Sequence, residues 1–311
     1  MDYRKIKKVL SMVLCAVFLI SSVGTAAADV PETVQAKLVA VETAMYGGEQ
    51  TGAILDRINH LEKDYTASYS TLGMMDRMDN LYATMFDNTR KPSVLTQMNA
   101  IEWAIMHQVS MASVQDRVTN MEMVIQGKVK EGTYKSRIAA LAKYAFGDAA
   151  IPLVQSAVPA NTLVKIKLVT PIQTKVLKEG DTVKYQVAED VIENGILLFA
   201  KGAPGEGAVT KSVPARNFGR NAEINIDFKT VKSVDGTTVD MFLGEEAKKE
   251  MQQLAMAAGA SAAGMVLLGP VGIVAGIFVQ GKNIDVPAGT EMYIQTKADC
   301  TLYGIQTTTV K

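Results

Sequence analysis

The sequence predicts an α+β protein in which an all-α helical repeat precedes an antiparallel β-barrel or sandwich with a Gly-rich apolar helical insertion. Three observations lead to this fold class. A pattern of 20 residues recurs six times between Lys37 and Gly147. Beyond residue 159 the apolar residues alternate with a period of 2, as in half-buried strands. Finally, residues 254–279 contain five glycines and no charged residue.

Residues 1–28 have the composition of a secretory signal peptide. Four basic residues lie within the first eight positions, before an uncharged run over residues 9–28 that ends in three alanines. A basic start, an apolar core and small residues at the cleavage point are typical of such a peptide. We predict cleavage after Ala28. An uncleaved membrane anchor is the alternative, because about 20 uncharged residues can just span a bilayer.

Residues 29–147 form the predicted helical repeat domain. Each copy has apolar residues at i, i+3 and i+7, which lie on one face of a short amphipathic helix. The core positions are Leu38, Val41, Met45, Ile58, Leu61, Met78, Leu81, Met98, Ile101, Val118, Met121, Ile138 and Leu141. A repeated helix that buries only one stripe requires its neighbours, which favours a scaffold over a catalyst.

The pattern favours six helices of about 13 residues, and three longer antiparallel helices are the alternative. Residues that cap helices precede four of the copies, at Thr33, Ser93, Ser113 and Thr133. A basic column recurs one position before the first apolar column, and a Glu column follows the second. We expect the basic column to be exposed and to tolerate alanine, because exposed ion pairs contribute only about 0–1 kcal/mol.

Residues 148–158 are the predicted linker, and residues 159–311 are the predicted β domain with its apolar helical insertion at 244–281. Alternating runs over residues 163–169, 181–187 and 223–228 are separated by Gly- and Asp-containing turns. The phrase Val-Pro-Ala-Asn-Thr at 158–162 returns as Val-Pro-Ala-Gly-Thr at 286–290. Roughly seven to nine strands are expected, with the first and last entered in equivalent ways.

The apolar insertion is the predicted membrane or oligomer contact. Its small residues allow close approach of helix backbones, as in membrane helix pairs. The contact positions are Gly259, Gly264, Gly269, Pro270, Gly272 and Gly276. The alternative is a helical hairpin that folds onto its own β domain, because Gly269-Pro270 divides the segment into halves that are each short for a membrane span.

The sequence contains no arrangement that indicates catalysis or a cofactor. His60 and His107 lie in the helical repeat, away from cysteines and from any repeated carboxylate spacing. Residues 276–283 resemble a phosphate-binding loop, but Asn283 replaces the hydroxyl that normally meets Mg²⁺ and the segment leads into a strand. We therefore expect a protein that is not an enzyme, without metal, cofactor or small-molecule substrate. The 28 basic and 31 acidic residues left after cleavage leave no excess of charge for nucleic acid.

From Val158 onward the chain resembles the outer-membrane core scaffold of type IV (conjugative) secretion systems. The similarity is carried by short phrases at 158–162, 178–182, 188–190, 197–202, 217–220, 234–236 and 286–290. The resemblance implies a β-barrel with a helical insertion before its last strands, which in that family crosses the outer membrane as a ring. This chain lacks the family's long Pro-rich arm, and its insertion is broken by Pro270.

Together these features predict an exported, non-enzymatic bacterial envelope scaffold, associated with the outer membrane and located there or in the periplasm. Its helical region is expected to bind itself or an envelope partner. One alternative is a channel-forming component of a secretion-type outer-membrane complex. The other is a soluble periplasmic interaction module.

Overall fold

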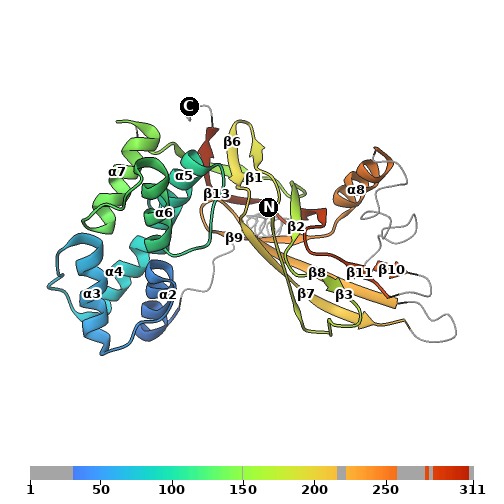
Figure 1. Cartoon of the computed structure of the whole chain (residues 1–311), viewed down its shortest axis with the longest axis horizontal. Helices are drawn as coiled ribbons and strands as arrows, with labels where there is room; N and C mark the ends of the chain where they lie inside the picture. Colours follow the sequence, from blue (N-terminus) through green and yellow to red (C-terminus); the bar gives the residue numbers. More distant parts are fainter. Residues whose placement is uncertain (1–30, 149, 216–221, 258–276, 280–282, 308–311) are drawn as a thin grey trace, which may run out of the picture.

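The computed structural model describes residues 31–148, 150–215, 222–257, 277–279 and 283–307. The predicted signal peptide and the six predicted contact residues of the apolar insertion (Gly259, Gly264, Gly269, Pro270, Gly272 and Gly276) lie outside these ranges. The described chain is α+β, as predicted: helices occupy its first half and antiparallel strands its second (Figure 1).

Six helices of 13 residues begin at intervals of 20 residues, which confirms the six-helix interpretation. They are α2 (Val34–Tyr46), α3 (Ile54–Thr66), α4 (Met74–Phe86), α5 (Val94–Met106), α6 (Val114–Gln126) and α7 (Tyr134–Phe146). The hydroxyls of Thr33, Ser93, Ser113 and Thr133 each accept a hydrogen bond from the backbone N–H three residues later. These caps satisfy N–H groups that the first turn leaves without a partner, and so fix where the helices begin.

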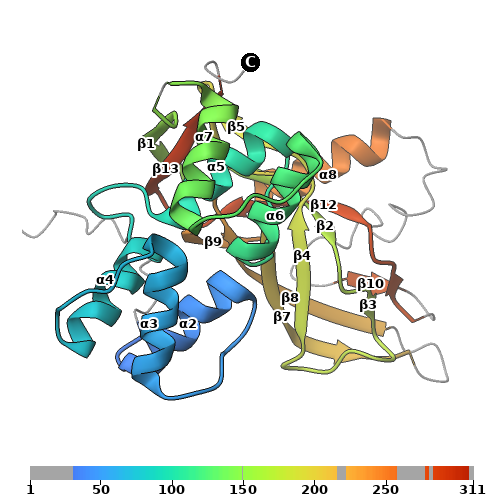
Figure 2. The ribbon, with the colours of Figure 1, turned by 60° about the vertical axis from the view of Figure 1, so that its left-hand side comes forward.

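The helices coil so that each contacts the next one along the chain, and α2 and α5 also contact the helices two places later, α4 and α7. Contacts four places apart join α2 to α6 and α3 to α7 (Figure 2). The apolar stripes of all six helices meet in one continuous core. Twelve of the thirteen core positions named above are buried, and Leu81 is half-buried.

A closed six-stranded antiparallel barrel forms the centre of the β domain. Its strands are β2 (Leu163–Leu168), β4 (Thr182–Val187), β7 (Pro204–Val213), β8 (Ala222–Lys232), β9 (Thr238–Phe242) and β12 (Glu291–Thr296). The barrel closes because β8 pairs with β7 along one edge and with β9 along the other, while β12 joins β9 to β2. Alternate residues of these strands fill the interior.

A second sheet of four strands lies beside the barrel. Its order is β1 (Leu153–Val158), β13 (Cys300–Gln306), β6 (Ile196–Phe199) and β5 (Val191–Glu193). The strand β1 occupies residues predicted to be linker, because the prolines at 152 and 159 that suggested a loop only flank it. The linker expectation is wrong over residues 153–158.

Thirteen strands lie in the described residues, more than the expected seven to nine. The difference comes from strands of two or three residues: β5, β3 (Ile172–Gln173), β11 (Asp285–Val286) and β10 (Ile277–Val279). Such short pairings carry too few residues for their alternation to be recognised. The equivalent turns at 158–162 and 286–290 are present: Asn161 and Gly289 both have positive φ, and the Thr162 and Thr290 hydroxyls donate to Pro159 and Pro287.

We predict that Leu61→Ala destabilises the protein by about 2–4 kcal/mol, because truncating a fully buried leucine leaves a cavity. Leu81 occupies the same column of the repeat but is half-buried, so Leu81→Ala is its matched control and should cost less. Urea unfolding of the two variants checks this. Equal losses of stability would contradict the assignment of the buried face.

Candidate functional site

The Arg and Glu columns of the repeat form a ladder of ion pairs between successive helices. Each arginine binds the glutamate 15 residues earlier: Arg57 to Glu42, Arg77 to Glu62, Arg117 to Glu102 and Arg137 to Glu122. The Arg77 Nε and Nη2 atoms lie 3.0 and 2.6 Å from the two Glu62 oxygens. Such two-pronged pairing is the strongest form of the Arg–carboxylate contact.

The expectation that the arginine column is exposed is wrong. The side chains of Arg77 and Glu62 keep only 7% and 9% of their accessible surface, and the other three pairs are similarly buried. The basic column lies beside the apolar stripe, and the coil turns it against the previous helix. The pairs therefore form part of the repeat's interior.

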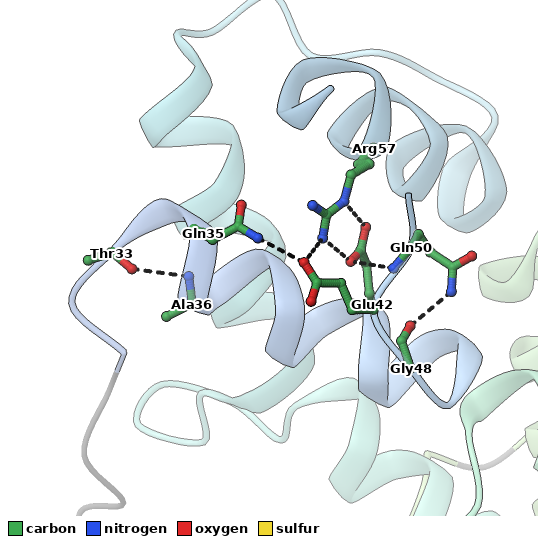
Figure 3. A network of polar contacts seen from close by, with 8 residues as sticks. Thr33, Gln35, Ala36, Glu42, Gly48, Gln50 and Arg57 are labelled. Carbon is green, nitrogen blue, oxygen red and sulfur yellow. Dashed lines mark hydrogen bonds and ion pairs between the residues drawn. The ribbon is translucent and has the colours of Figure 1, made fainter. Parts of the chain in front are cut away.

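Each ladder glutamate also holds the loop that follows its own helix. The carboxylates of Glu42, Glu62, Glu102 and Glu122 accept the backbone N–H of the residue eight positions later. Figure 3 shows the first case, where Glu42 receives both Arg57 and the N–H of Gln50. One buried carboxylate thus fixes its helix, its loop and the next helix.

The negative charge of two of these glutamates, Glu62 and Glu122, is stabilised by the same contacts. Burial would raise the pKa of Glu62, but the hydrogen bonds from Arg77 and from the Ser70 N–H hold it below its ordinary value. Burial would likewise raise the pKa of Glu122, but the hydrogen bonds from Arg137 and from the Lys130 N–H hold it below its ordinary value. Both carboxylates therefore remain ionised in the folded repeat near neutral pH.

Where the ladder is interrupted, the arginine and the glutamate of the pair are replaced together. Between α4 and α5, Tyr82 replaces the glutamate and Gln97 replaces the arginine. At the two ends of the array, Lys37 has no preceding copy and Ala142 has no following copy. Lys37 pairs instead with Asp79 of α4. Every ladder arginine therefore faces a glutamate, and every ladder glutamate faces an arginine. This agrees with the high cost of a buried charge that has no partner.

The interrupted junction is where the helical repeat meets the β domain. Thr96 and Asn99 of α5 donate to the backbone oxygens of Asp235 and Val234, in the turn between β8 and β9. Asn88, in the preceding loop, also donates to the Asp235 oxygen. The Trp103 indole N–H lies 2.8 Å from a carboxylate oxygen of Asp190.

An apolar cluster surrounds these hydrogen bonds. Ala100, Trp103 and Val109 from the repeat pack against Leu197, Ala200, Val234 and Ile305 of the β domain. The Asp235 carboxylate in turn binds Ser233, Thr237 and the N–H of Tyr303, so the receiving turn is itself rigid. The interface therefore couples the repeat to the barrel and to the side sheet at once.

The positions that all copies share do not predict this interface with the β domain. The outward positions of α5 are Thr96, Asn99, Ala100 and Trp103, whereas the equivalent positions of α3 are Asp56, Asn59, His60 and Lys63. The equivalent positions of α2, Ala36, Val39, Ala40 and Thr43, are also uncharged, but they hold no aromatic residue and are not buried. A tryptophan on the outward face of a helix is a large apolar side chain that favours burial against a neighbour. The position of the chain's one tryptophan on this face was the available signal.

The barrel holds both flanks of the apolar insertion. On one side, α8 (Glu245–Ala257) packs on β12: the Ala247 N–H donates to Gln295, and Met251 is buried in the barrel core. On the other side, residues 277–279 of the predicted helical insertion form the strand β10, which pairs with β8, so the helical expectation is wrong at these residues. Within the part of the chain that the structure describes, no helix is long and apolar enough to cross a membrane.

The two histidines have structural positions. His60 lies 3.3 Å from Asp64 on α3, and His107 ends α5 in a left-handed conformation. Among the described residues, no group of three or more His, Cys, Asp or Glu side chains is arranged to hold a metal ion. Half of the phosphate-loop-like segment 276–283, residues 276 and 280–282, lies outside those residues.

We predict that Arg77→Ala costs about 3–5 kcal/mol, because it leaves the Glu62 charge buried and unpaired. The double variant Glu62→Tyr/Arg77→Gln copies the natural junction between α4 and α5 and should be clearly more stable. Lys143→Ala, which breaks a solvent-exposed pair with Asp148, is the control and should change stability by less than about 1 kcal/mol. Denaturant titration compares them, and a double variant as unstable as Arg77→Ala would refute the pairing rule.

At the domain interface, we expect Trp103→Ala to cost about 3–5 kcal/mol through lost packing. Trp103→Phe keeps most of the ring contact and loses only the hydrogen bond to Asp190, so about 1 kcal/mol is expected. Equilibrium unfolding separates the two variants. Equal losses would mean that the hydrogen bond, and not the apolar cluster, dominates the interface.

Comparison with known proteins does not assign the chain to a family. No protein-family model matches it, and no curated protein matches its sequence. Among solved structures it is similar to ComB10 of the Com type IV secretion system of Helicobacter pylori, at 14% identity and a TM-score of 0.25. That match covers 46% of this chain and 88% of ComB10. Values this low carry no argument about fold, partners or activity.

Proposed function

We propose that this chain is a non-enzymatic scaffold of the bacterial cell envelope. In this proposal it is exported, its helical repeat binds a partner or a further copy of itself, and its barrel carries the apolar insertion. The observation that supports it best is the position of the barrel between two kinds of interaction element. One side of the barrel holds α5 of the repeat, and other strands of it hold both flanks of the insertion.

The rigidity of the whole supports a scaffold role. The ladder fixes the helices to one another, and the interface at α5 fixes the repeat to the barrel. A protein built this way presents its surfaces at a constant separation, which is the property that an assembly component needs. Figure 1 shows the repeat and the distal ends of β7 and β8 at opposite ends of the molecule.

The sequence of the insertion supports an envelope location. Residues 251–281 contain no charged side chain. An uncharged stretch of that length is an unfavourable surface for a monomer in water, because large exposed apolar patches mark sites of interaction. The basic and apolar composition of residues 1–28 is consistent with export.

Subcellular fractionation of the native protein tests the proposal. We expect the full chain to sediment with the envelope and to lack residues 1–28 by intact-mass measurement. A variant with residues 258–276 replaced by a Gly/Ser linker of the same length should move to the soluble fraction. Trp103→Phe, which leaves the insertion unchanged, is the matched control and should stay with the envelope.

Each alternative has its own outcome. A full chain in the soluble periplasmic fraction would favour a soluble interaction module over the proposed scaffold. Ion conductance of the purified full chain in planar bilayers, lost in the linker variant, would favour the channel-forming component. A full chain that remains in the cytoplasm would reject the proposal.

A further inference from the structure

Inside the helical repeat, the starts of later helices stack on the ends of earlier ones. The start of α6 lies on the end of α2, where a Cβ atom at Gly47 would be 3.8 Å from the Cβ of Ser113. The start of α7 lies on the end of α3, where the pKa of Tyr134 is raised, mainly by burial and also by the nearby Asp64 carboxylate. This stacking defines an interface that recurs four copies apart.

Burial of the first residue differs from helix to helix. Val114 of α6 is completely buried, and Val94 of α5 is buried although no helix lies four places earlier. Val34 of α2, Ile54 of α3 and Tyr134 of α7 are half-buried, and Met74 of α4 is 41% exposed. We call Val34, Ile54 and Met74, whose helices have none four places earlier, the lower end of the repeat.

The eleventh residue of the helix is exposed only in α6 and α7. It is half-buried in the other four helices, at Ala44, Asp64, Thr84 and Ala104, and the first two of these belong to α2 and α3, which contact α6 and α7. In α6 it is Val124, which is 59% exposed, and in α7 it is Tyr144, which is 62% exposed. We call Val124 and Tyr144 the upper end. Figure 1 shows α2 and α3 at the bottom of the repeat and α7 at the top, with the β domain at its side.

The upper end carries apolar residues where the ends of a soluble array carry polar ones. Repeat proteins usually carry polar residues on the outer face of their terminal copies, which keeps the ends soluble. Here the half-buried positions of α2 and α3 hold an alanine and an aspartate, Ala44 and Asp64, whereas the exposed positions of α6 and α7 hold a valine and a tyrosine. Among the described residues, these two apolar side chains are left open to solvent.

We propose that a second copy of this chain covers them, by placing the lower end of its helical repeat on the upper end of the first. The contact would continue between molecules the stacking that already exists within one. The inference rests on the self-association included in the proposed function, and it names the surfaces and the partner. A contact between two different surfaces repeats from copy to copy, giving a ring if it closes and a filament if it does not.

Two single-end variants of the full chain in detergent solution test the proposal by light-scattering mass. Val124→Glu/Tyr144→Glu places charges on the upper end, and Met74→Glu places one on the lower end. Each should weaken self-association about tenfold or more, because a charge without a partner is costly at a dry contact. Val176→Glu, at an equally exposed apolar residue of the β domain, is the control and should associate normally.

Mixing the two end variants gives the decisive result. Each retains the end that the other has lost, so an equimolar mixture should form one-to-one dimers and nothing larger. Thermal melts confirm that both are folded, and Met74→Lys replaces Met74→Glu if that variant is not. A monomeric full chain, undiminished association of either variant, or a mixture that stays monomeric would each overturn the proposal.

This outcome is separable from the test of envelope location. The variant with residues 258–276 replaced retains both ends of the repeat, so it should still self-associate whichever fraction it enters. Loss of its association would show that the insertion makes the contact between copies, and would overturn the stacking proposal while leaving the envelope proposal in place.

Discussion

The buried pairing of an arginine with the glutamate of the previous helix is the contact on which the helical repeat depends. A 13-residue helix is marginal by itself in water, so its stability must come from neighbours. Apolar stripes supply much of that stability, but they tolerate sliding. The ladder does not, because Arg77 reaches both oxygens of Glu62 only at one offset between the helices. It thereby sets the register in which the stripes meet.

A second constraint joins this array to the barrel. The copy that begins at Ser93 lacks the ladder on its N-terminal side and carries Trp103 on its outward face. Asn88, in the loop before this helix, donates to the backbone oxygen of Asp235. The turn at Asp235 is itself held by three further contacts. Interruption of the repeat and attachment to the barrel are thus two aspects of one local change in sequence.

Periodicity was sufficient to predict the helices, their starts and their inward face, because each copy repeats the same evidence. It wrongly predicted that the arginine column is exposed. Whether the flank of a helix is buried depends on how the neighbouring helices pack against it, and the sequence of one helix does not encode that packing. The alternation of apolar residues predicted the strands of the barrel. The closure of the barrel depends on the pairing of β8 along both of its edges, which involves residues far apart in the sequence. At the interface, Trp103 marks an outward face that favours burial, but its partners on the β domain are long-range and could not be predicted from one helix.

The double attachment of each ladder glutamate also limits how such a protein can change in length. Glu62 binds the N–H of Ser70, eight residues later, and the side chain of Arg77, fifteen residues later. A single residue inserted or deleted between them would therefore break at least one of these two contacts. Point insertions in these loops are thereby disfavoured even though the loops lie at the surface. Evolution of the array is expected to proceed by gain or loss of whole units of 20 codons, through unequal recombination rather than gradual drift.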